Sequence, residues 1–391
     1  MRLRTGCAAA VVALLVTGLA AGAAPRPTVL GVSWESTTGV LSRLDAQTLR
    51  PVGRRLDIGK PPTALVARSP DGRTVVLGHG SIAELRFVDL RSMRANGGLR
   101  VAAVGSILNG IWPSSNRLIA LRAGTDPAVV LVDPAARRVL RQTPLDGEAI
   151  GAIATKGRLV ALLTPKRAIG PASLAVVESD GSVATVALPG VAAGFAPPQD
   201  ERGTARQASP GVAVDPTGTR AAVVTPESLL VVDLDRLEVT GRHVSRAPAR
   251  VGKLIEGWSR GATWVRGDTI ALSGWRYSVK DQRIVQSTMG VELVDVASGK
   301  ARPLDPTATR ATVVGGNLLT FGGTALRGYS LAGDLRFELL RGRDTGYIQT
   351  AGRWIYVGRD NSTVFSVVDA RAGRVVGTAR TPNPTIVLGP G

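Results

Sequence analysis

The sequence has little of what builds disulfides, metal centres or a large aromatic core. Its 391 residues include one cysteine, two histidines and only 4% aromatic residues. The cysteine, Cys7, precedes the N-terminal hydrophobic run, so a chain without its leader would contain none. Such a chain excludes disulfides, a thiol nucleophile, covalently attached c-type haem and cysteine-ligated metals. Two histidines exclude copper clusters and other multi-histidine sites.

Motifs for nucleophilic or nucleotide chemistry are also missing from the sequence. It has no G-x-S-x-G elbow, no P-loop and no dinucleotide fingerprint. The two histidines, His79 and His243, follow strands in different parts of the chain. We interpret both as strand-end surface residues, with a general base as the alternative. The sequence therefore predicts no cofactor, no metal site and no catalytic residue.

Negative charge is scarce relative to positive charge. The chain has 30 acidic residues against 42 arginines and 6 lysines, which gives a formal charge of +18. The arginines are scattered and not clustered on one face, whereas nucleic-acid-binding proteins usually concentrate them. A high-GC coding bias explains them most simply. Attraction to an anionic envelope polymer or lipid headgroup is the alternative, and we expect no nucleic-acid partner.

The N-terminus reads as an export signal. Arg2 and Arg4 precede an uncharged stretch that ends in an A-x-A pattern at Ala21–Ala23. We expect a signal peptide at 1–23, cleaved after Ala23, and one domain at 24–391. Retention of Cys7–Ala24 as a membrane anchor is the alternative. After cleavage we expect a bacterial protein of the cell envelope or exterior that is monomeric and not integral to a membrane.

One sequence pattern recurs eight times along the chain. It consists of an apolar run that ends in an acidic residue or its equivalent, followed by a turn and a second strand. The first three intervals between these anchors are 44, 44 and 45 residues, from Asp45 to Glu178. Before many copies stands a hairpin-turn phrase such as Ser69-Pro70-Asp71-Gly72. The recurring turn aspartates are interpreted as bonding to their own turns, with calcium ligation as the alternative. They are Asp45, Asp89, Asp133, Asp233, Asp295 and Asp369.

Four short strands repeated every 40–45 residues predict an all-β propeller. We expect eight four-stranded blades, with seven as the alternative. The first unit starts at Thr28–Trp34 and lacks its first strand, while an apolar strand, Thr385–Leu388, stands alone at the C-terminus. We therefore expect this last strand to complete the first blade and close the ring, which removes exposed sheet edges.

The unit from Ser209-Pro210-Gly211 to Val231-Val232-Asp233 resembles the YVTN-type propeller repeats of exported bacterial proteins. The later units, with Gly316-Asn317-Leu318 and Gly352-Arg353-Trp354, resemble quinoprotein-type blades. The resemblance covers about residues 28–389 and implies a fold, because these motifs are turns. The enzymes of such families also suggest an alternative function, a lactonase or a quinone-cofactor dehydrogenase.

Three long connections, at Gly190–Ser209, Ser245–Ala262 and Trp275–Thr288, should leave one face of the ring and form a continuous wall. Aromatic and arginine side chains are concentrated there, a composition enriched at protein interfaces. Packing between blades is the alternative role for the aromatics. The candidate binding residues are Trp258, Arg260, Trp275, Arg276, Tyr277 and Arg283.

The leading hypothesis is therefore a non-catalytic binding or scaffold module whose partner is a protein or an anionic envelope polymer. The enzyme alternative needs carboxylates that converge at the centre of the ring. The candidates for that role are Glu148, Glu256, Asp268 and Asp344.

Overall fold

The structure is a computed structural model of the whole chain. It describes residues 27–390 apart from 36–37, 60–61, 80–81, 125, 156, 198–205, 245–254, 281–282 and 360–361. Every regular element in this part is a β-strand. No helix of the described residues has the length and apolar character needed to cross a membrane. The expected signal peptide, residues 1–23, lies outside the described residues.

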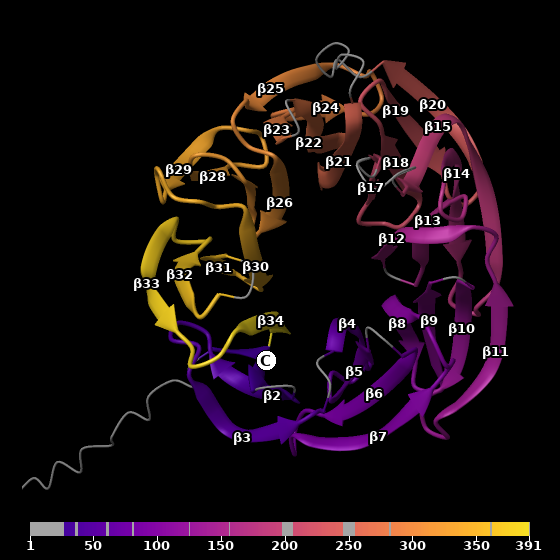
Figure 1. Cartoon of the computed structure of the whole chain (residues 1–391), viewed down its shortest axis with the longest axis vertical. Coiled ribbons are helices and arrows are strands. Elements are labelled where there is room, and N and C mark those ends of the chain that lie inside the picture. Colours follow the sequence, from indigo (N-terminus) through magenta and orange to yellow (C-terminus); the bar gives the residue numbers. More distant parts are fainter. Residues whose placement is uncertain are drawn as a thin grey trace, which may run out of the picture.

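The 34 strands of the described residues form seven sheets arranged in a ring (Figure 1). Six sheets have four strands and one has ten. The first sheet consists of β1 (Thr28–Glu35), β2 (Thr38–Asp45), β3 (Pro51–Asp57) and β34 (Thr385–Pro390). The next two are β4 (Pro62–Arg68), β5 (Thr74–His79), β6 (Glu84–Asp89) and β7 (Arg94–Arg100), then β8 (Ser106–Ser114), β9 (Arg117–Ala123), β10 (Ala128–Asp133) and β11 (Arg138–Pro144).

The other three four-stranded sheets follow the same pattern. They are β17 (Gly211–Val214), β18 (Arg220–Val224), β19 (Ser228–Asp233) and β20 (Glu238–Val244); β26 (Arg310–Val314), β27 (Asn317–Phe321), β28 (Leu326–Tyr329) and β29 (Leu335–Leu339); and β30 (Tyr347–Ala351), β31 (Trp354–Gly358), β32 (Val364–Asp369) and β33 (Arg374–Arg380). The ten-stranded sheet contains β12 (Glu148–Ala154), β13 (Leu159–Thr164), β14 (Ile169–Val177), β15 (Val183–Ala196), β16 (Arg206–Ser209), β21 (Ile255–Arg266), β22 (Thr269–Lys280), β23 (Arg283–Thr288), β24 (Val291–Asp295) and β25 (Ala301–Asp305).

The fold is therefore an all-β propeller, as the repeats predicted. Six of its sheets are separate four-stranded blades, which differs from the eight blades, with seven as the alternative, that the sequence predicted. The reason lies in β16, which pairs antiparallel with β15 and parallel with β21. This short strand joins the group β12–β15 to the group β21, β22, β24 and β25 across the intervening blade β17–β20.

In each four-strand group one strand lies at the centre of the ring and the other three follow it outward (Figure 1). We name the strands a to d in that order. The a–b and c–d turns lie at one end of the ring, called the turn end. The b–c and d–a connections lie at the other, called the loop end. β34 occupies position a of the first blade, where it pairs antiparallel with β1. This is the ring closure that the sequence predicted.

The core consists of eight clusters of buried apolar side chains among the described residues, each between two neighbouring four-strand groups. The inner strands of a blade are covered on both faces. In β13, for example, the continuous apolar run Leu159–Leu163 is buried on both faces. Alternate residues of such a strand enter the cores on its two sides. One cluster contains Tyr356 and Phe365 of the last blade with Val387 of β34, so the ring is also closed by packing.

The turn aspartates act as the sequence predicted. Four of the six accept hydrogen bonds from the backbone N–H groups two and three residues further on. Asp89 and Asp295 accept from the N–H group three residues further on. In Asp295, for example, Oδ1 accepts from the Ser298 hydroxyl at 2.7 Å and from its N–H at 2.8 Å. These bonds hold the pKa of Asp295 below its usual value, because they favour the charged form.

Candidate functional site

The three expected loops are strands over most of their described length, which corrects the sequence prediction. β15 continues to Ala196 through Pro189-Gly190, because its ladder with β14 contains an irregularity that absorbs the Pro-Gly pair. β21 and β22 have 12 residues each and extend past their blade at the loop end. There β23 replaces β24 as the partner of β22. We call the ladder of β16, Gly257–Gly261, Trp275–Lys280 and β23 the loop-end sheet.

The loop-end sheet joins the three segments that the sequence placed in one wall. β15 pairs with β16, β16 with β21, β21 with β22, and β22 with β23. One row of partners across these strands runs through Phe195, Gln207, Gly257, Tyr277 and Gln286. The segments are therefore hydrogen-bonded neighbours at the loop end.

The candidate aromatics divide between the two faces of this sheet. Trp258 is the partner of Arg276, so these two side chains share one face. Trp275 and Tyr277 lie on the other, because neighbouring residues of a strand alternate. Their ring centroids are 5.8 Å apart with an interplanar angle of 30°. Only Trp275 and Tyr277 among these four therefore form an aromatic pair.

Glycine makes room for this pair. A Cβ atom at Gly257, the partner of Tyr277, would lie 2.7 Å from the tyrosine ring. The Tyr277 ring therefore occupies the space that a side chain at position 257 would fill. On the opposite face Arg276 Nε donates a 3.0 Å hydrogen bond to Ser287 Oγ, which fixes that side chain to β23.

Arg260 is buried, whereas the sequence placed it on a binding surface, although it is among the residues that line the pocket described below. Its side chain is 1% exposed and its Nη2 donates to Glu292 Oε1 at 3.2 Å. Nη1 faces the sulfur of Met289 at 3.5 Å, and Nε has no hydrogen-bond partner. Burial lowers the pKa of Arg260 and the carboxylate of Glu292 opposes this. The sequence could not show this, because β21 extends beyond its blade and residue 260 turns inward at the junction.

Some candidates fall outside the described residues. The side chains of Arg283 and Glu256 are not described, although their backbones belong to β23 and β21. Segments 198–205 and 245–254, which contain Arg202, Arg246 and Arg250 of the predicted wall, are also outside the described residues. His79 has no described side chain. His243 has a structural role, since its Nε2 lies 2.8 Å from the carbonyl oxygen of Val296.

A pocket of about 360 Å³ opens beside Trp275 at the loop end. It lies between β21–β22 and the start of β26, and we call it the aromatic pocket. Trp275 is half-buried and Arg310 is exposed. Hydroxyl groups complete the polar part of the wall. The side chains that carry them are Ser259, Thr263, Ser273 and Thr309.

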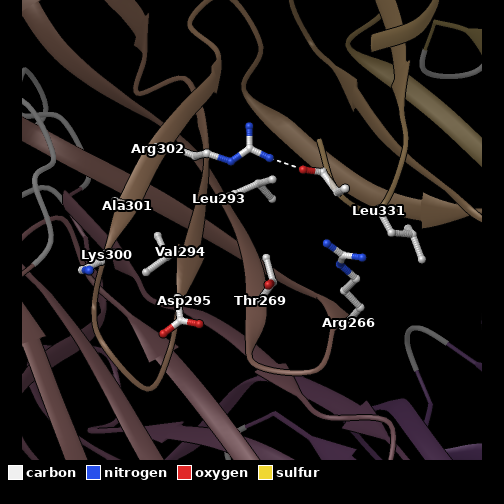
Figure 2. A pocket seen from close by; sticks show the side chains of 10 residues that line it. Arg266, Thr269, Leu293, Val294, Asp295, Lys300, Ala301, Arg302 and Leu331 are labelled. Atoms are coloured by element: carbon white, nitrogen blue, oxygen red, sulfur yellow. Dashed lines mark hydrogen bonds between the residues drawn. The ribbon is translucent and has the colours of Figure 1, made fainter. Parts of the chain in front are cut away.

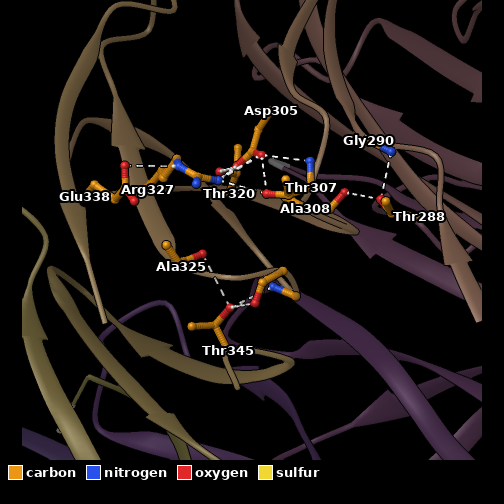
Figure 3. A network of polar contacts seen from close by, with 12 residues as sticks. Thr288, Gly290, Asp305, Thr307, Ala308, Thr320, Ala325, Arg327, Glu338 and Thr345 are labelled. Carbon is orange, nitrogen blue, oxygen red and sulfur yellow. Dashed lines mark hydrogen bonds and ion pairs between the residues drawn. The ribbon is translucent and has the colours of Figure 1, made fainter. Parts of the chain in front are cut away.

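Hydrogen bonds fasten the two walls of this pocket to each other. Thr263 Oγ1 donates to the carbonyl oxygen of Ala311 at 3.0 Å, and Thr288 Oγ1 to that of Ala308 at 2.6 Å. Figure 3 shows the second of these bonds beside the Asp305 carboxylate. The aromatic pocket is thus preorganised between neighbouring blades.

Asp305 anchors the chain where it enters the pocket wall. Its carboxylate, 1% exposed, accepts from Thr320 at 2.6 Å and lies 2.9 Å from Arg327 Nη1 (Figure 3). Burial works to raise the pKa of Asp305, but hydrogen bonds from Thr320, Thr307 and Arg327 outweigh it and the pKa lies below its usual value. The carboxylate therefore stays charged and, by accepting from the N–H and hydroxyl of Thr307, fixes the turn that leads to Ala308 and Thr309.

The sequence missed Arg310, Thr309 and the serines of this pocket. Arg310 is one of 42 arginines scattered along the chain, so nothing in its local sequence distinguishes it as a binding residue. Its place in strand a of the blade after β21 could have been used, because neighbouring a strands meet around the centre of the ring.

The candidate carboxylates for catalysis are separated. Asp268 lies in the a–b turn at the turn end, 2.6 Å from Arg220. Asp344 lies at the loop end and accepts a hydrogen bond from the N–H of Gly346. Glu148 is half-buried at the start of β12. In the described part of the chain, no three histidine, cysteine or acidic side chains come close enough to hold a metal ion.

The centre of the ring is lined mainly by uncharged side chains. The exposed residues on the innermost strands, where side chains are described, are Ile150, Gly151, Ala154, Arg266, Arg310 and Thr350. The two arginines stand at opposite ends, because Arg266 ends β21 and Arg310 begins β26.

No family model and no curated protein matches the chain. Among solved structures, the dihydro-heme d1 dehydrogenase NirN, in complex with DHE, is similar with a TM-score of 0.60 and 13% identity. That similarity covers 91% of this chain and 74% of NirN. Apo AztD from Citrobacter koseri is similar with a TM-score of 0.52 and 14% identity, covering 93% of this chain and 97% of AztD. These neighbours support the propeller fold.

Proposed function

We propose that this chain is an exported, non-catalytic propeller that binds a cell-envelope partner through the loop-end sheet and the aromatic pocket. The observation that carries the proposal is the position of Trp275, which pairs with Tyr277 on one face and lines the pocket. Aromatic surface beside a few fixed polar groups is the usual composition of a binding pocket.

The chemistry of the pocket favours an anionic, sugar-containing envelope polymer over a protein partner. Hydroxyl-bearing walls suit the hydroxyl groups of a sugar, and the half-buried indole of Trp275 offers a flat apolar surface for its ring. Arg310, exposed in the same pocket, supplies one positive charge for an acidic substituent. The net charge of +18 would also attract such a polymer over a longer range.

The finer description of the fold belongs to this proposal. We count eight blades by treating the ten-stranded sheet as two blades bridged by β16. The eight interblade clusters support this count, since a closed ring has as many interfaces as blades. The kinship with YVTN-type and quinoprotein-type repeats rests on the turn sequences.

Export rests on the N-terminal sequence alone. We expect N-terminal sequencing of secreted protein to begin at Ala24. Recovery of intact residues 1–23 in the membrane fraction would contradict cleavage and favour the anchor.

The enzyme alternative has less support. It needs carboxylates that converge near the centre of the ring, whereas Asp268 and Asp344 lie at opposite ends. NirN is a dehydrogenase by its name, and at 13% identity this likeness extends only to the fold.

The function can be tested by co-sedimentation of purified protein with envelope polymer. We expect Tyr277→Ala and Arg310→Ala to reduce the bound fraction. The first removes the ring that pairs with Trp275, and the second removes a positive charge of the aromatic pocket. Arg73→Ala and Arg374→Ala change arginines at the turn end and should leave binding intact. Loss of binding in the turn-end variants, with retention in the pocket variants, would overturn the proposal.

A further inference from the structure

A second pocket lies at the turn end, far along the strands from the aromatic pocket. It has a volume of about 330 Å³ and lies between the blade of β24–β25 and the c–d turn of the next blade (Figure 2). We call it the arginine pocket. Two arginines from different strands, Arg266 and Arg302, enter it from opposite sides.

The Arg302 guanidinium is held in place by the neighbouring blade. Its Nη2 donates to the carbonyl oxygen of Ala332. A Cβ atom at Gly333 would overlap this guanidinium, so the turn leaves space for it. Arg302 is thus positioned without using a carboxylate.

Arg266, at the end of β21, is exposed, as Arg302 is. In the described part of the chain neither arginine has an acidic partner within ion-pair distance. Two guanidinium groups that share a concave site and lack a counter-ion repel each other, and an anion between them would relieve this repulsion.

The charge of the lining favours a dianion. Arg266, Arg302 and Lys300 stand against one carboxylate, Asp295, which leaves a net charge of +2. Asp295 is already committed, since it accepts both hydrogen bonds from Ser298. The apolar part of the wall consists of Leu293, Val294 and Leu331.

We propose that the arginine pocket binds the phosphate group of a phosphate ester. Guanidinium groups bind phosphate through paired, charge-assisted hydrogen bonds, and a phosphate monoester carries nearly two negative charges at neutral pH. The Thr269 hydroxyl supplies another hydrogen bond from the pocket wall. Leu331, which is half-buried at the pocket, would contact the carbon chain of the ester. This site is independent of the aromatic pocket.

The test is a calorimetric titration of the full chain with glycerol phosphate and with inorganic phosphate. Vesicles of phosphatidylglycerol, with phosphatidylcholine vesicles as the neutral reference, distinguish a lipid headgroup from a soluble ester. We expect saturable binding that Arg266→Glu weakens at least about tenfold, a change of roughly 1.4 kcal/mol. Arg73→Glu makes the same charge change at the same end and should alter affinity less than about twofold.

Arg266→Gln and Trp275→Ala complete the design. Arg266→Gln removes the charge with a small change of shape, and its melting temperature reports whether folding is intact. Trp275→Ala should retain phosphate binding, which separates this proposal from that for the aromatic pocket. Equal losses in Arg266→Glu and Arg73→Glu, or the absence of saturable binding to all phosphate probes, would overturn the proposal. Binding of the anionic vesicles alone, lost in Arg266→Glu, would assign the phosphate to a lipid headgroup.

Discussion

The hydroxyl of Tyr356 donates a 2.8 Å hydrogen bond to the carbonyl oxygen of Ala46, a residue 310 positions earlier in the chain. Tyr356 belongs to the last blade and Ala46 follows strand β2 of the first. Burial raises the pKa of Tyr356, so the phenol remains a donor at all physiological pH values. A second tie comes from Gln349, whose side chain bonds to the backbone of Thr385 and Val387 in β34.

Removing the Tyr356 hydroxyl should weaken the closure without disturbing its packing. Tyr356→Phe leaves the buried carbonyl of Ala46 without this donor, which should cost about 1–3 kcal/mol of unfolding free energy. Urea denaturation measures the change. An unfolding free energy that Tyr356→Phe leaves unchanged would contradict this role of the hydroxyl in closure.

Deletion of residues 384–391 should have a larger effect. It removes β34, whose Val387 enters the core between the last and first blades and whose Leu388 packs in the next core. We expect a loss of several kcal/mol, a large part of a stability of about 5–15 kcal/mol. Deletion of Gly391 alone is the control. An unchanged melting temperature after the longer deletion would refute closure by this strand.

Neighbouring blades also share a contact between a d-strand side chain and a turn glycine. His243 lies against Gly299, where a Cβ atom would stand 2.6 Å from Nδ1, and Phe337 lies against Gly373 in the same way. Gly299 has a φ of +70°, and Gly72, with open space around it, has a φ of +71°. Alanine at either position meets similar backbone strain, of order 1–3 kcal/mol, but only at Gly299 does it meet a side chain.

Gly299→Ala should therefore destabilise the protein more than Gly72→Ala. The difference between the two unfolding free energies measures the interblade contact. Adding His243→Ala to Gly299→Ala should recover part of the loss, because the clash then disappears. Equal effects of the two glycine substitutions would show that the turn alone matters.

The Asp305 pair predicts a dependence of stability on pH. The folded pKa of Asp305 lies below its usual value, so this carboxylate adds stability above its unfolded pKa of about 3.9. That contribution is lost as the pH falls through the lower, folded pKa. Asp305→Asn should therefore be clearly destabilised at pH 7 and approach the wild type in acid. Asp126→Asn, at an exposed position, is the control; a gap that is constant with pH would contradict the account.

The repeats carried most of the fold because they encode turns. Asp89, Asp133 and Asp233 hydrogen-bond their own turns, and such local chemistry can be read from one segment of sequence. The closing role of β34 could also be predicted, since a unit with one strand too few and a terminal strand without a unit complement each other. β16 could not, because its pairing with β21 joins strands far apart in the sequence and leaves no local pattern.

The candidate site was predicted by region and only in part by residue. The high local density of aromatics located the loop-end sheet, but strand alternation separated Trp258 from Trp275 and Tyr277. The burial of Arg260 depends on Glu292 of another strand, 32 positions away, and its charge alone suggested a surface residue. Arg310 joins the pocket only through the ring order of the blades.

The most direct test of the proposed function compares Trp275→Ala with Trp258→Ala in binding to purified anionic envelope polysaccharide. Both variants remove an indole from the loop-end sheet, but only Trp275 lines the aromatic pocket and pairs with Tyr277. We predict that Trp275→Ala raises the dissociation constant roughly thirtyfold, which corresponds to a loss of about 2 kcal/mol of binding free energy. Trp258→Ala should leave the dissociation constant within about threefold of the wild-type value. Equal affinities for wild type and Trp275→Ala, or a larger loss of affinity in Trp258→Ala, would contradict the proposed binding role of the aromatic pocket.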